Sequence, residues 1–373
     1  MFKLMKKKKP KDQKTSAEDR KPKTGRKSAS ATNSVQQSIV AIERQAEVRD
    51  FCQAVLQLKV SGIEAAFQRN PRKCDMKKCT VFSRNQAKNR YKDVGCLDDG
   101  RVILRDNGGN DYIHANYVAT PENPHRFICC QAPLESTCAD HWKMIVQDGV
   151  EVILMLCDFL EKNLKKCAEY FPMDPASPKT FGPYTIHLKK KEMMKWECQT
   201  QAEVVVSHFT VEVDGRQVHQ LTHYHWQKWP DRGVPTADQA LIYLLKTFSQ
   251  TEKPIVVHCS AGIGRTGSIV LIQYILESIN AGSKACNDVE KLLTDLRKQR
   301  ANSVQTHHQY LFVHQVLLNY FYKEGFLDKS VEPFIAAFSA AYEKATSESK
   351  DKPTNEASYC GEVKRQHDLQ TLH

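Results

Sequence analysis

The first regular feature of the chain is a helical repeat of apolar residues between Val35 and Phe67. Apolar side chains that recur every three to four residues form one face of a helix, and that face is buried when the helix packs on a core. The segment therefore predicts one or two covering helices over residues 35–70. The residues that set the repeat are Ile39, Ile42, Val48, Phe51, Val55 and Leu58.

The middle of the chain changes to short apolar and alternating runs that are typical of β-strands. They are Tyr112–Val118, Phe127–Gln131, Val152–Cys157, Tyr184–Leu188, Val204–Val213, Val218–Trp226 and Ile255–Val257. Helical patterns interleave with these runs and follow them, at Ala237–Ser249, Ser268–Asn280, Asp288–Gln299, His307–Tyr322 and Val331–Ala345. This order predicts an α/β (α+β) fold, in which one large domain over residues 35–325 has a twisted mixed β-sheet flanked by helices. A C-terminal helix is expected over residues 326–346.

Composition separates this domain from two tails. The 373 residues are 41% hydrophobic and 26% charged, which is ordinary for a globular protein with a sizeable core. Of the net charge of +11, residues 1–30 hold +9, with twelve Lys and Arg against three Asp and Glu. Residues 1–34 predict a basic disordered tail and residues 347–373 a polar disordered tail. The basic tail suits an anionic surface (lipid or nucleic acid), nuclear import, or simple solvation.

Cysteine usage and the absence of long apolar runs predict a cytoplasmic or nuclear protein. No apolar core follows Met1–Met5, and no run reaches the length of a membrane span, so we expect neither a signal peptide nor a transmembrane segment. The thirteen cysteines, an odd number without paired spacing, predict reduced thiols. Neither Cys74 and Cys79 nor Cys129-Cys130 has a convincing metal-ligand spacing, so we expect no metal.

The most specific chemistry lies in His258-Cys259-Ser260-Ala261-Gly262-Ile263-Gly264-Arg265-Thr266-Gly267, between an apolar run and a predicted helix. A glycine-bearing loop at the start of a helix turns backbone N–H groups toward a tetrahedral dianion, and the same groups favour a thiolate. Cys259 supplies a nucleophile, and Arg265 supplies a planar fork for two phosphate oxygens. The loop therefore predicts attack of sulfur on phosphorus. The binding amides would come from Ser260, Ala261, Gly262, Ile263 and Gly264.

Two other interpretations of this loop explain fewer residues. Gly262-x-Gly264-x-x-Gly267 matches a dinucleotide-binding pattern, and Asp288 follows at a tolerable distance. That pattern belongs to an early strand–helix–strand unit, whereas this loop is late in the chain and Asp288 begins a helical pattern. The other alternative is a buried structural cysteine beside a packing loop. Neither gives a reason for both Cys259 and Arg265.

A second segment, Trp229-Pro230-Asp231-Arg232-Gly233-Val234-Pro235, supplies a candidate general acid. Its Trp, Pro and Gly residues are typical of a loop with a restricted backbone. If the loop closed over a substrate, the Asp231 carboxyl would reach the leaving oxygen, where general acid catalysis contributes about 10²–10⁴-fold. Taken alone, Asp231 would be an ordinary turn residue. The nucleophile loop downstream favours the catalytic interpretation.

Together, the two segments resemble the tyrosine-specific protein tyrosine phosphatases, of the non-receptor type with a single catalytic domain. The resemblance extends over roughly residues 45–325, in the family's order. It implies hydrolysis of phosphotyrosine in signalling proteins through a cysteinyl-phosphate intermediate, with no metal or organic cofactor. Other matching segments are Lys88–Asp93, Asp111–Ile113, Gln131–Leu134, Lys166–Pro172 and Val304–Tyr310.

The resemblance also implies a role for each matching residue. Cys259 is the implied nucleophile, and Arg265 is the implied phosphate ligand that stabilises the transition state. Asp231 is implied as general acid and then base, while Gln305 orients the attacking water with support from Gln309. Thr266 is implied to donate a hydrogen bond to the Cys259 sulfur. His258 is implied to hold the loop and to favour the thiolate.

Further residues are implied to shape the site. Glu161 would pair with Arg265 and fix its fork. Tyr91 would wall a deep slot that only a phosphotyrosine ring spans, although by itself it would be a core aromatic beside a turn. Asp93 would bind the substrate backbone at the rim. The implied supporting positions are Lys166, Trp229 and Pro230.

Several scaffold positions depart from the family pattern. His114 stands where an Asn is usual, Ala132 where a Gly is usual, and Phe171 where a Trp is usual, while Asp99-Gly100-Arg101 replaces His-Ser-Arg. These changes bear on loop placement and catalytic efficiency more than on the type of reaction. Asn302 stands where some members have Gly, and its side chain would narrow access for bulky or doubly phosphorylated peptides.

Two alternative functions stay open at this point. A pseudophosphatase that binds phosphotyrosine without efficient hydrolysis would be expected to lack one of Cys259, Arg265, Asp231 or Gln305, and all four are present. A phosphoinositide or dual-specificity phosphatase would be expected to lack the segments around Tyr91 and Gln305.

Overall fold

The computed structural model describes residues 28–70, 74–105, 108–283 and 287–347, with side chains from residue 44 onward. The disorder predicted for residues 1–27 and 348–373, and the partners predicted for the basic tail, lie outside the described residues. The chain divides into two compact units, Met1–Ile42 and Glu43–His373. In the first unit, the described residues are helical. The site lies in the second unit.

The helix α1 spans Ser28–Arg69 and contains one residue, Lys59, whose backbone is not helical (φ 57°, ψ 178°). The predicted one or two helices are therefore two helical stretches that meet at Lys59. Because α1 begins at Ser28, it includes residues 28–34, which composition alone assigns to the tail. These residues have no apolar stripe, so periodicity gave no sign of the helix there. Within the second unit, α1 contributes to the core Val48, Phe51, Val55 and Ile63.

Among the described residues, nine strands form one mixed sheet in the order β1-β2-β3-β11-β4-β10-β9-β8-β7. Its central neighbours β3, β11, β4 and β10 are parallel, and the outer pairs are antiparallel. Residues of β3, β11 and β4 are buried throughout, as expected of parallel strands covered on both faces. The strands are β1 (Arg101–Ile103), β2 (Tyr112–Val118), β3 (Phe127–Gln131), β4 (Val152–Met155), β7 (Lys179–Phe181), β8 (Tyr184–Met193), β9 (Glu203–Val213), β10 (Arg216–Gln227) and β11 (Ile255–Cys259). A separate hairpin pairs β5 (Leu160–Glu161) with β6 (Leu164–Lys165).

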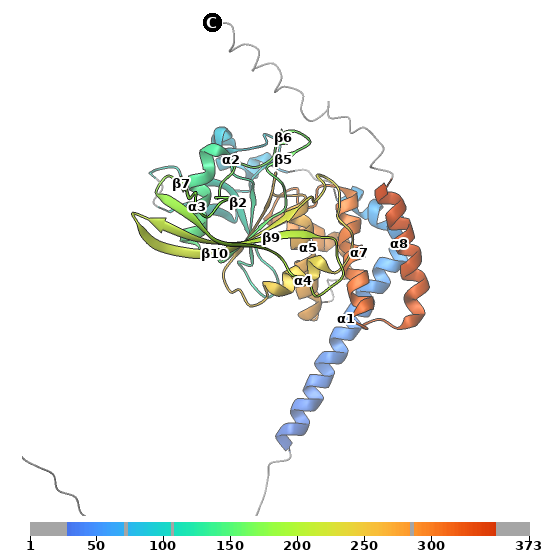
Figure 1. Ribbon diagram of the computed structural model, residues 1–373. Coiled ribbons are helices and arrows are strands. Elements are labelled where there is room, and N and C mark those ends of the chain that lie inside the picture. Colours follow the sequence, from blue (N-terminus) through green and yellow to red (C-terminus); the bar gives the residue numbers. More distant parts are fainter. Residues whose placement is uncertain (1–27, 71–73, 106–107, 284–286, 348–373) are drawn as a thin grey trace, which may run out of the picture. The chain divides into compact units, whose positions relative to one another are not determined.

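Helices cover the sheet (Figure 1). Helix α5 packs against β11, α6 and α7, while α8 packs on α7, and α3 packs against β7 and β8. The α-helices after α1 are α2 (Thr80–Arg84), α3 (Cys138–Gln147), α4 (Ala240–Thr247), α5 (Arg265–Asn280), α6 (Val289–Gln299), α7 (His307–Lys323) and α8 (Glu332–Ser347). Short 3₁₀ turns are η1 (Met76–Lys78), η2 (Gln86–Lys88), η3 (Glu135–Thr137) and η5 (Lys329–Val331).

The arrangement agrees with the predicted fold class, a mixed sheet flanked by helices. Each predicted strand and helix is present, with shifted ends: β4 ends at Met155 instead of Cys157, and β8 continues to Met193 because its later residues still pair with β9. The elements without a prediction are β1, α2, α3, the β5–β6 hairpin and β7. All except α3 are five residues or shorter, too short for periodicity to be informative.

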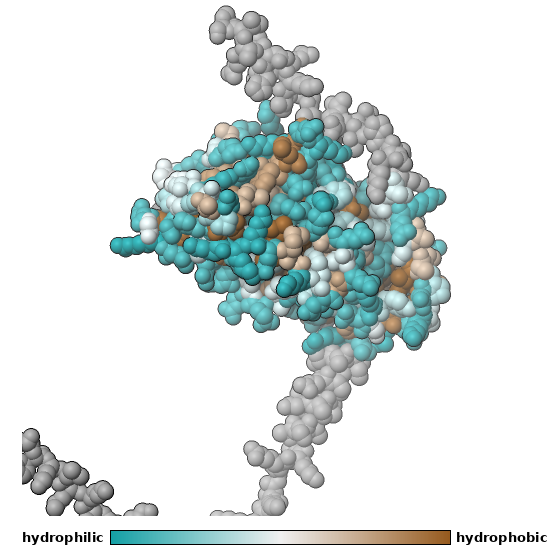
Figure 2. Space-filling view, in the orientation of Figure 1, coloured by the Kyte–Doolittle hydropathy of each residue, from teal (hydrophilic) through white to brown (hydrophobic). Residues whose placement is uncertain are grey.

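The visible face of the molecule is mostly polar, with a hydrophobic group near the β5–β6 hairpin (Figure 2). Two leucines of this hairpin, Leu160 and Leu164, are 66% and 52% exposed. No helix in the described part of the chain has the length and apolar character needed to cross a bilayer.

Candidate active site

The nucleophile loop connects the end of a buried central strand to the start of a helix. Strand β11 ends at Cys259 and α5 begins at Arg265. Gly262 has φ 69°, and a Cβ at this position would lie 2.0 Å from the Cys130 carbonyl oxygen. At Gly267, a Cβ would lie 2.5 Å from the Val304 backbone nitrogen. Both positions require glycine because neighbouring backbone leaves no room for a side chain.

The Cys259 side chain lies inside this loop. The residue is 4% exposed, and its sulfur accepts a hydrogen bond from the Gly262 N–H at 3.3 Å. The loop also forms the N-terminus of α5, where the helix dipole favours negative charge. A backbone donor and a helix N-terminus thus both lie at this sulfur.

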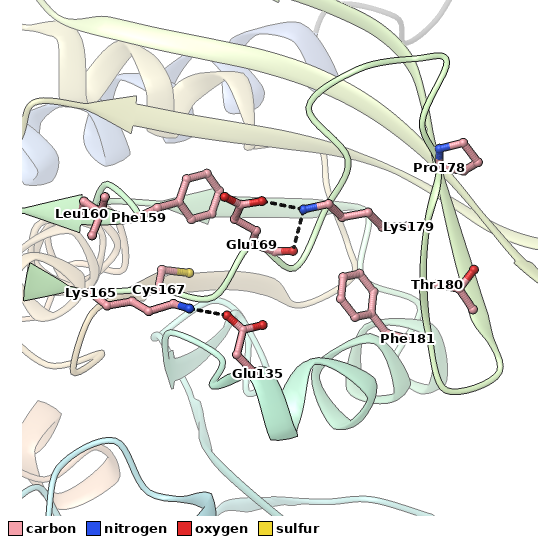
Figure 3. A pocket seen from close by; sticks show the side chains of 10 residues that line it. All are labelled: Glu135, Phe159, Leu160, Lys165, Cys167, Glu169, Pro178, Lys179, Thr180 and Phe181. Atoms are coloured by element: carbon pink, nitrogen blue, oxygen red, sulfur yellow. Dashed lines mark hydrogen bonds and ion pairs between the residues drawn. The ribbon is translucent and has the colours of Figure 1, made fainter. Parts of the chain in front are cut away.

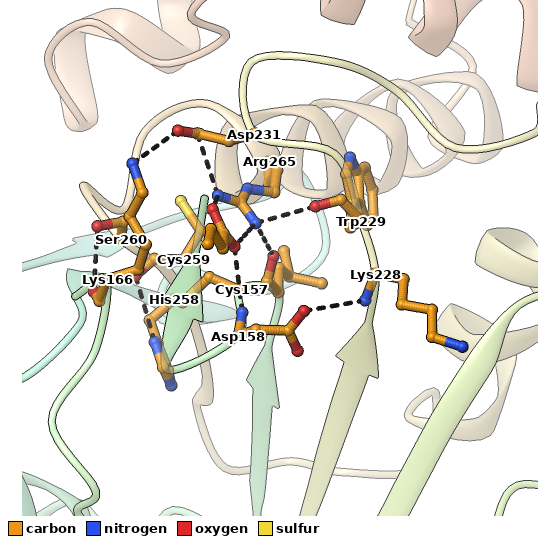
Figure 4. A network of polar contacts seen from close by, with 12 residues as sticks. Cys157, Asp158, Lys166, Lys228, Trp229, Asp231, His258, Cys259, Ser260 and Arg265 are labelled. Carbon is orange, nitrogen blue, oxygen red and sulfur yellow. Dashed lines mark hydrogen bonds and ion pairs between the residues drawn. The ribbon is translucent and has the colours of Figure 1, made fainter. Parts of the chain in front are cut away.

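Arg265 is held rigidly behind the loop (Figure 4). Its guanidinium makes a bidentate pair with Glu161, with Nη1–Oε1 at 2.5 Å and Nη2–Oε2 at 2.8 Å. Nη1 also donates to the carbonyl oxygens of Leu156 at 2.8 Å and Trp229 at 3.1 Å. Burial lowers the pKa of Arg265, but the hydrogen bonds to Glu161 and the attraction of nearby acidic groups together outweigh this and hold the pKa above its usual range. The side chain is therefore a fixed cation.

Asp231 lies across from the nucleophile loop, on the segment that follows β10. Its Oδ1 is 3.1 Å from Nη2 of Arg265, and its Oδ2 accepts a hydrogen bond from Lys166 Nζ at 2.8 Å. Burial raises the pKa of Asp231, but attraction to Arg265 and the hydrogen bond from Lys166 outweigh it, so the pKa lies below its usual range. The carboxylate is thus ionised near neutral pH while it holds these two cations.

The loop that bears Asp231 lies closed over Arg265. The Trp229 ring is buried and packs edge-on against Phe312, with ring centroids 5.8 Å apart. Arg232 adopts φ 58°, and its carbonyl oxygen accepts a hydrogen bond from the Thr306 hydroxyl at 3.2 Å. Together with the bond from Arg265 to the Trp229 carbonyl, these contacts place Pro230 and Asp231 over the loop.

His258 supports the loop from within the core. Its Nε2 is 2.7 Å from the Tyr170 hydroxyl, which is also 2.8 Å from Nε2 of His223. Burial lowers the pKa of His258 well below its ordinary value, so the ring is neutral at physiological pH. His258 thus acts on the loop through hydrogen bonding and packing, without a positive charge.

Tyr91 contacts the nucleophile loop through Ser260. The Tyr91 hydroxyl is 2.8 Å from the Ser260 hydroxyl, which donates to the Lys166 carbonyl at 3.1 Å. Gln131 holds the segment before Tyr91 at two points, by donating to the Lys88 carbonyl at 2.8 Å and accepting from the Arg90 N–H at 2.9 Å. The Tyr91 ring is therefore fixed beside the loop.

Asp93 follows two residues later on the same segment and is exposed. The resemblance implies a place at the edge of the site for this residue, and that role stays a prediction.

Gln305 and Gln309 lie next to Gly264 of the loop. A Cβ at Gly264 would be 2.9 Å from Gln305 Oε1 and 3.1 Å from Gln309 Nε2. Gln309 Oε1 accepts the backbone N–H of Gln305 at 2.8 Å, and the Thr306 hydroxyl caps the start of α7. The side-chain amide of Gln309, on α7, and that of Gln305, on the turn before α7, thus both face the nucleophile loop.

Comparison with known proteins agrees with this arrangement. A family model described as protein-tyrosine phosphatase matches residues 85–319. The chain belongs to this family.

Individual relatives give the extent of the similarity. The chain is 34% identical to receptor-type tyrosine-protein phosphatase zeta of Rattus norvegicus over 266 residues, which is 66% of this chain and 11% of that protein. It is 35% identical to tyrosine-protein phosphatase non-receptor type 9 of Homo sapiens over 267 residues, which is 66% of this chain and 44% of that protein. The chain therefore spans less than half the length of these curated relatives.

One solved structure is similar in fold to this chain. It is described as "Structural basis of PTPN18 fingerprint on distinct HER2 tyrosine phosphorylation sites". The TM-score is 0.62 at 28% sequence identity, and the match covers 74% of this chain and 99% of that chain. The similarity in fold supports the predicted fold class independently of the motifs.

One residue of the family pattern is arranged differently from the expectation. Thr266 is fully buried, and its hydroxyl has no hydrogen-bond partner among the described residues. The expected donation to the Cys259 sulfur is therefore not made here, and the sulfur receives the Gly262 N–H instead. Both Thr266 and Cys259 belong to the loop, but chain adjacency does not set the rotamer of a hydroxyl.

Sequence reasoning missed Arg300, which supports the loop from its far side. Arg300 is fully buried, and its Nε donates to the Gly262 carbonyl at 3.1 Å and its Nη2 to the Ala261 carbonyl at 3.3 Å. Its Nη1 donates to Asn116 Oδ1 at 2.9 Å. The only signal in the sequence is that Arg300 directly follows the basic end of a predicted helix. An arginine at such a position is usually exposed to solvent.

The unusual His114 is part of the same support. Its Nε2 donates to the Val94 carbonyl at 2.8 Å, and its Nδ1 accepts from Arg300 Nη2 at 3.2 Å. Burial first, and then the charge of Arg300, lower the pKa of His114 to about 3, so the ring stays a neutral acceptor. The histidine therefore links Arg300 to the segment that follows Tyr91.

The other departures also keep scaffold contacts. The Ala132 carbonyl accepts from Arg90 Nε at 3.2 Å, and its N–H donates to the Ser260 carbonyl at 3.0 Å. The Phe171 ring is buried and packs edge-on to Tyr170, with ring centroids 4.9 Å apart. Gly100 takes φ 65° in a turn. These positions thus keep hydrogen bonds, packing and a turn with the changed residues in place.

A pocket of about 660 Å³ lies beside the β5–β6 hairpin (Figure 3). Two ion pairs border it, between Lys165 and Glu135 at 2.5 Å and between Lys179 and Glu169 at 2.7 Å. No residue from the loop 259–265 lines this pocket. Within the described ranges, no three His, Cys, Asp or Glu side chains are placed to hold a metal ion.

Proposed function

We propose that this chain hydrolyses phosphotyrosine in peptides and proteins through a cysteinyl-phosphate intermediate. The observation that supports this most directly is the arrangement around Arg265. Its fork is fixed by Glu161, the nucleophile Cys259 opens the same loop, and the carboxylate of Asp231 faces it from the opposite side. A phosphate bound by Arg265 and the loop amides would lie between a thiolate and a carboxyl group, as in-line transfer to sulfur requires.

In the first step, the Cys259 sulfur attacks phosphorus and the bond to the tyrosine oxygen breaks. Asp231 gives that oxygen a proton, so the leaving group departs as a neutral phenol. In the free protein, Asp231 is paired with Arg265 and Lys166. A phosphate dianion that takes over the Arg265 fork removes part of this attraction and adds a negative charge nearby. Both effects raise the pKa of Asp231 and favour its acid form.

In the second step, water attacks phosphorus and the S–P bond breaks. Asp231, now a carboxylate, accepts a proton from the water, which Gln305 orients with support from Gln309. The proximity of both amides to Gly264 supports this role. The buried Thr266 hydroxyl has no other partner in the described part of the chain, so it is available to the leaving sulfur.

Selectivity for phosphotyrosine would come from Tyr91. Its ring is fixed at the loop through Ser260 and would form one wall of a slot. A phosphoserine side chain is shorter than a phosphotyrosine side chain, so its phosphate would not reach Arg265 at the bottom of such a slot. Asp93, exposed at the edge, would accept N–H groups of the peptide backbone.

The test is phosphate release from matched phosphotyrosine and phosphoserine peptides in the presence of a metal chelator. We expect release from the phosphotyrosine peptide only. Binding of the phosphotyrosine peptide by the folded protein without any release would instead support a phosphotyrosine-binding role.

Replacing Tyr91 with Ala is expected to raise KM for the phosphotyrosine peptide. An aromatic contact is worth about 0.5–1.5 kcal/mol, which corresponds to roughly a two- to twelvefold change in KM. The same substitution should reduce the preference over phosphoserine by a similar factor. Tyr91→Phe is the matched control, because it keeps the ring and loses only the contact to the Ser260 hydroxyl. Unchanged selectivity in Tyr91→Ala would show that another residue forms the wall.

Replacing Asn302 with Gly is expected to broaden the range of accepted peptides. Asn302 has φ 62°, a conformation that Gly adopts without steric cost, and its Oδ1 is buried without a partner among the described residues. Removing the side chain should raise kcat/KM for a doubly phosphorylated peptide by about tenfold relative to a singly phosphorylated one. Asn302→Ala, which keeps a Cβ, should give a smaller gain. No gain in the Gly variant would mean that Asn302 does not limit access.

A further inference from the structure

A pair of thiols lies outside the catalytic residues, on the segment that leads to Tyr91. Cys74 and Cys79 flank the η1 turn, and their sulfur atoms are 3.4 Å apart. The turn is held by the Asp75 side chain, which accepts the Lys77 N–H at 3.1 Å, and by the Cys79 N–H, which donates to the Met76 carbonyl at 3.1 Å. A short, hydrogen-bonded turn thus keeps the two sulfurs in contact.

The two thiols differ in accessibility. Cys74 is half-buried, so a small oxidant can reach it, whereas Cys79 is fully buried. The hydrogen bond from the Cys79 thiol lowers the pKa of Cys74, although burial opposes this, and Arg300 lowers it further. The same contact raises the pKa of Cys79. The accessible sulfur is therefore the one that ionises more readily, and thiolate is the form that reacts with peroxides.

We propose that Cys74 and Cys79 form a reversible disulfide when the protein meets a peroxide. The Cys74 thiolate attacks one peroxide oxygen, the O–O bond breaks, and Cys74 becomes a sulfenic acid, while the hydroxide that leaves takes a proton from solvent to become water. The Cys79 sulfur then attacks the Cys74 sulfur, the S–O bond breaks, and the leaving hydroxyl takes the Cys79 proton and departs as a second water. Two thiols lose two electrons and hydrogen peroxide gains them. The final S–S bond of about 2.05 Å needs the sulfurs to approach by about 1.3 Å, within reach of side-chain rotation.

Cys74 and Cys79 also pack against the backbone of the segment that follows Tyr91. A Cβ on Gly95 would lie 2.8 Å from the Cys74 sulfur and 2.9 Å from the Cys79 sulfur, so the sulfurs pack directly on this backbone. The preceding residue, Val94, accepts the hydrogen bond from His114, which in turn accepts from Arg300. Movement of the sulfurs therefore reaches both the segment after Tyr91 and the nucleophile loop. On the proposed function, oxidation should change KM more than kcat.

Peptide mass spectrometry tests the disulfide without reference to activity. Wild type and Cys259→Ser are treated with hydrogen peroxide, the remaining thiols are alkylated, and the digests are searched for a Cys74–Cys79 link. We expect the link in both proteins, its loss with dithiothreitol, and its absence in Cys74→Ser. Cys198→Ser, which removes a half-buried thiol elsewhere, should keep it. Recovery of Cys74 and Cys79 as free thiols, or their pairing only with other cysteines, would overturn the proposal.

A second arm measures KM for a phosphotyrosine peptide after peroxide treatment. Molecules in which Cys259 has been oxidised release no phosphate and do not affect the measured KM. The KM of the molecules that remain active therefore reports whether Cys74 and Cys79 are linked. We expect KM to change by about two- to tenfold in wild type and to stay constant in Cys74→Ser. If the link forms and KM is equal in both proteins, the inferred coupling to the substrate side is wrong. Absence of any phosphate release before oxidation would contradict the proposed function and leave the mass-spectrometric result intact.

Discussion

Replacing Cys259 with Ser is expected to abolish phosphate release from a phosphotyrosine peptide, with a loss in kcat on the order of 10⁶-fold, as in other enzymes that lose their nucleophile. A serine hydroxyl is not ionised near neutral pH, so the Gly262 N–H and the α5 N-terminus have no anion to stabilise. Arg265 and the loop amides stay in place, so the variant should still bind the phosphotyrosine peptide. The measurements are phosphate release and calorimetric binding to the same peptide.

Cys198→Ser serves as the control for this substitution. Cys198 is half-buried and far from the nucleophile loop in sequence, so its replacement should leave kcat within about twofold. Appreciable turnover by Cys259→Ser would mean that sulfur is not the nucleophile and would contradict the proposed mechanism.

Replacing Asp231 with Asn is expected to lower kcat by about 10²–10⁴-fold, because general acid catalysis contributes that much. An amide cannot protonate the leaving oxygen, nor can it accept a proton from water in the second step. The effect should be largest for a poor leaving group such as a tyrosine peptide and much smaller for an activated aryl phosphate, whose phenolate leaves without a proton. Phosphate release from both substrates separates these cases.

The pH profile gives a further check on Asp231. A general acid acts only while it is protonated, so the rate that it supports falls as pH rises above its pKa. In the free protein, Arg265 and Lys166 hold the pKa of Asp231 below its usual range. Bound phosphate is expected to raise this pKa in the enzyme–substrate complex, which the pH profile of kcat reports. We therefore expect kcat of the wild type to fall toward alkaline pH, and this limb to be absent in Asp231→Asn.

Asp214→Asn is the matched control, since Asp214 is exposed in the turn between β9 and β10. It should keep both the wild-type rate and the alkaline limb. An alkaline limb that persists in Asp231→Asn would assign the acid to another residue.

The chemistry that sequence analysis identified best is local in the chain. Cys259 and Arg265 are separated by five residues, and the glycine at position 262 indicates a tight loop between a strand and a helix. Backbone geometry follows from such short-range spacing, because few conformations place a strand, a left-handed residue and a helix in succession. The long strands β9 and β10 and the amphipathic helices were also readable, since each is long enough to show its period.

Contacts between residues far apart in the chain could not be predicted from the spacing of residues in the sequence. Glu161 and Arg265 are 104 positions apart, and Asp231 and Arg265 are 34 apart. Their pairing was expected only because the chain resembles a known family. Arg300 and His114, 186 positions apart, had no such signal. A basic residue after a helix resembles a solvated one until the fold buries it against carbonyl oxygens.

The sequence by itself determined the fold class, the nucleophile loop and the candidate acid, because these depend on periodicity and on residues close together in the chain. Only the tertiary structure decided that Arg265 holds Glu161 and Asp231 at once, that Thr266 leaves the sulfur to a backbone N–H, and that Cys74 and Cys79 lie in contact. These features depend on which side chains meet when the sheet is covered by helices. Burial then fixes their charge and partners, since a buried polar group must find a partner within the protein.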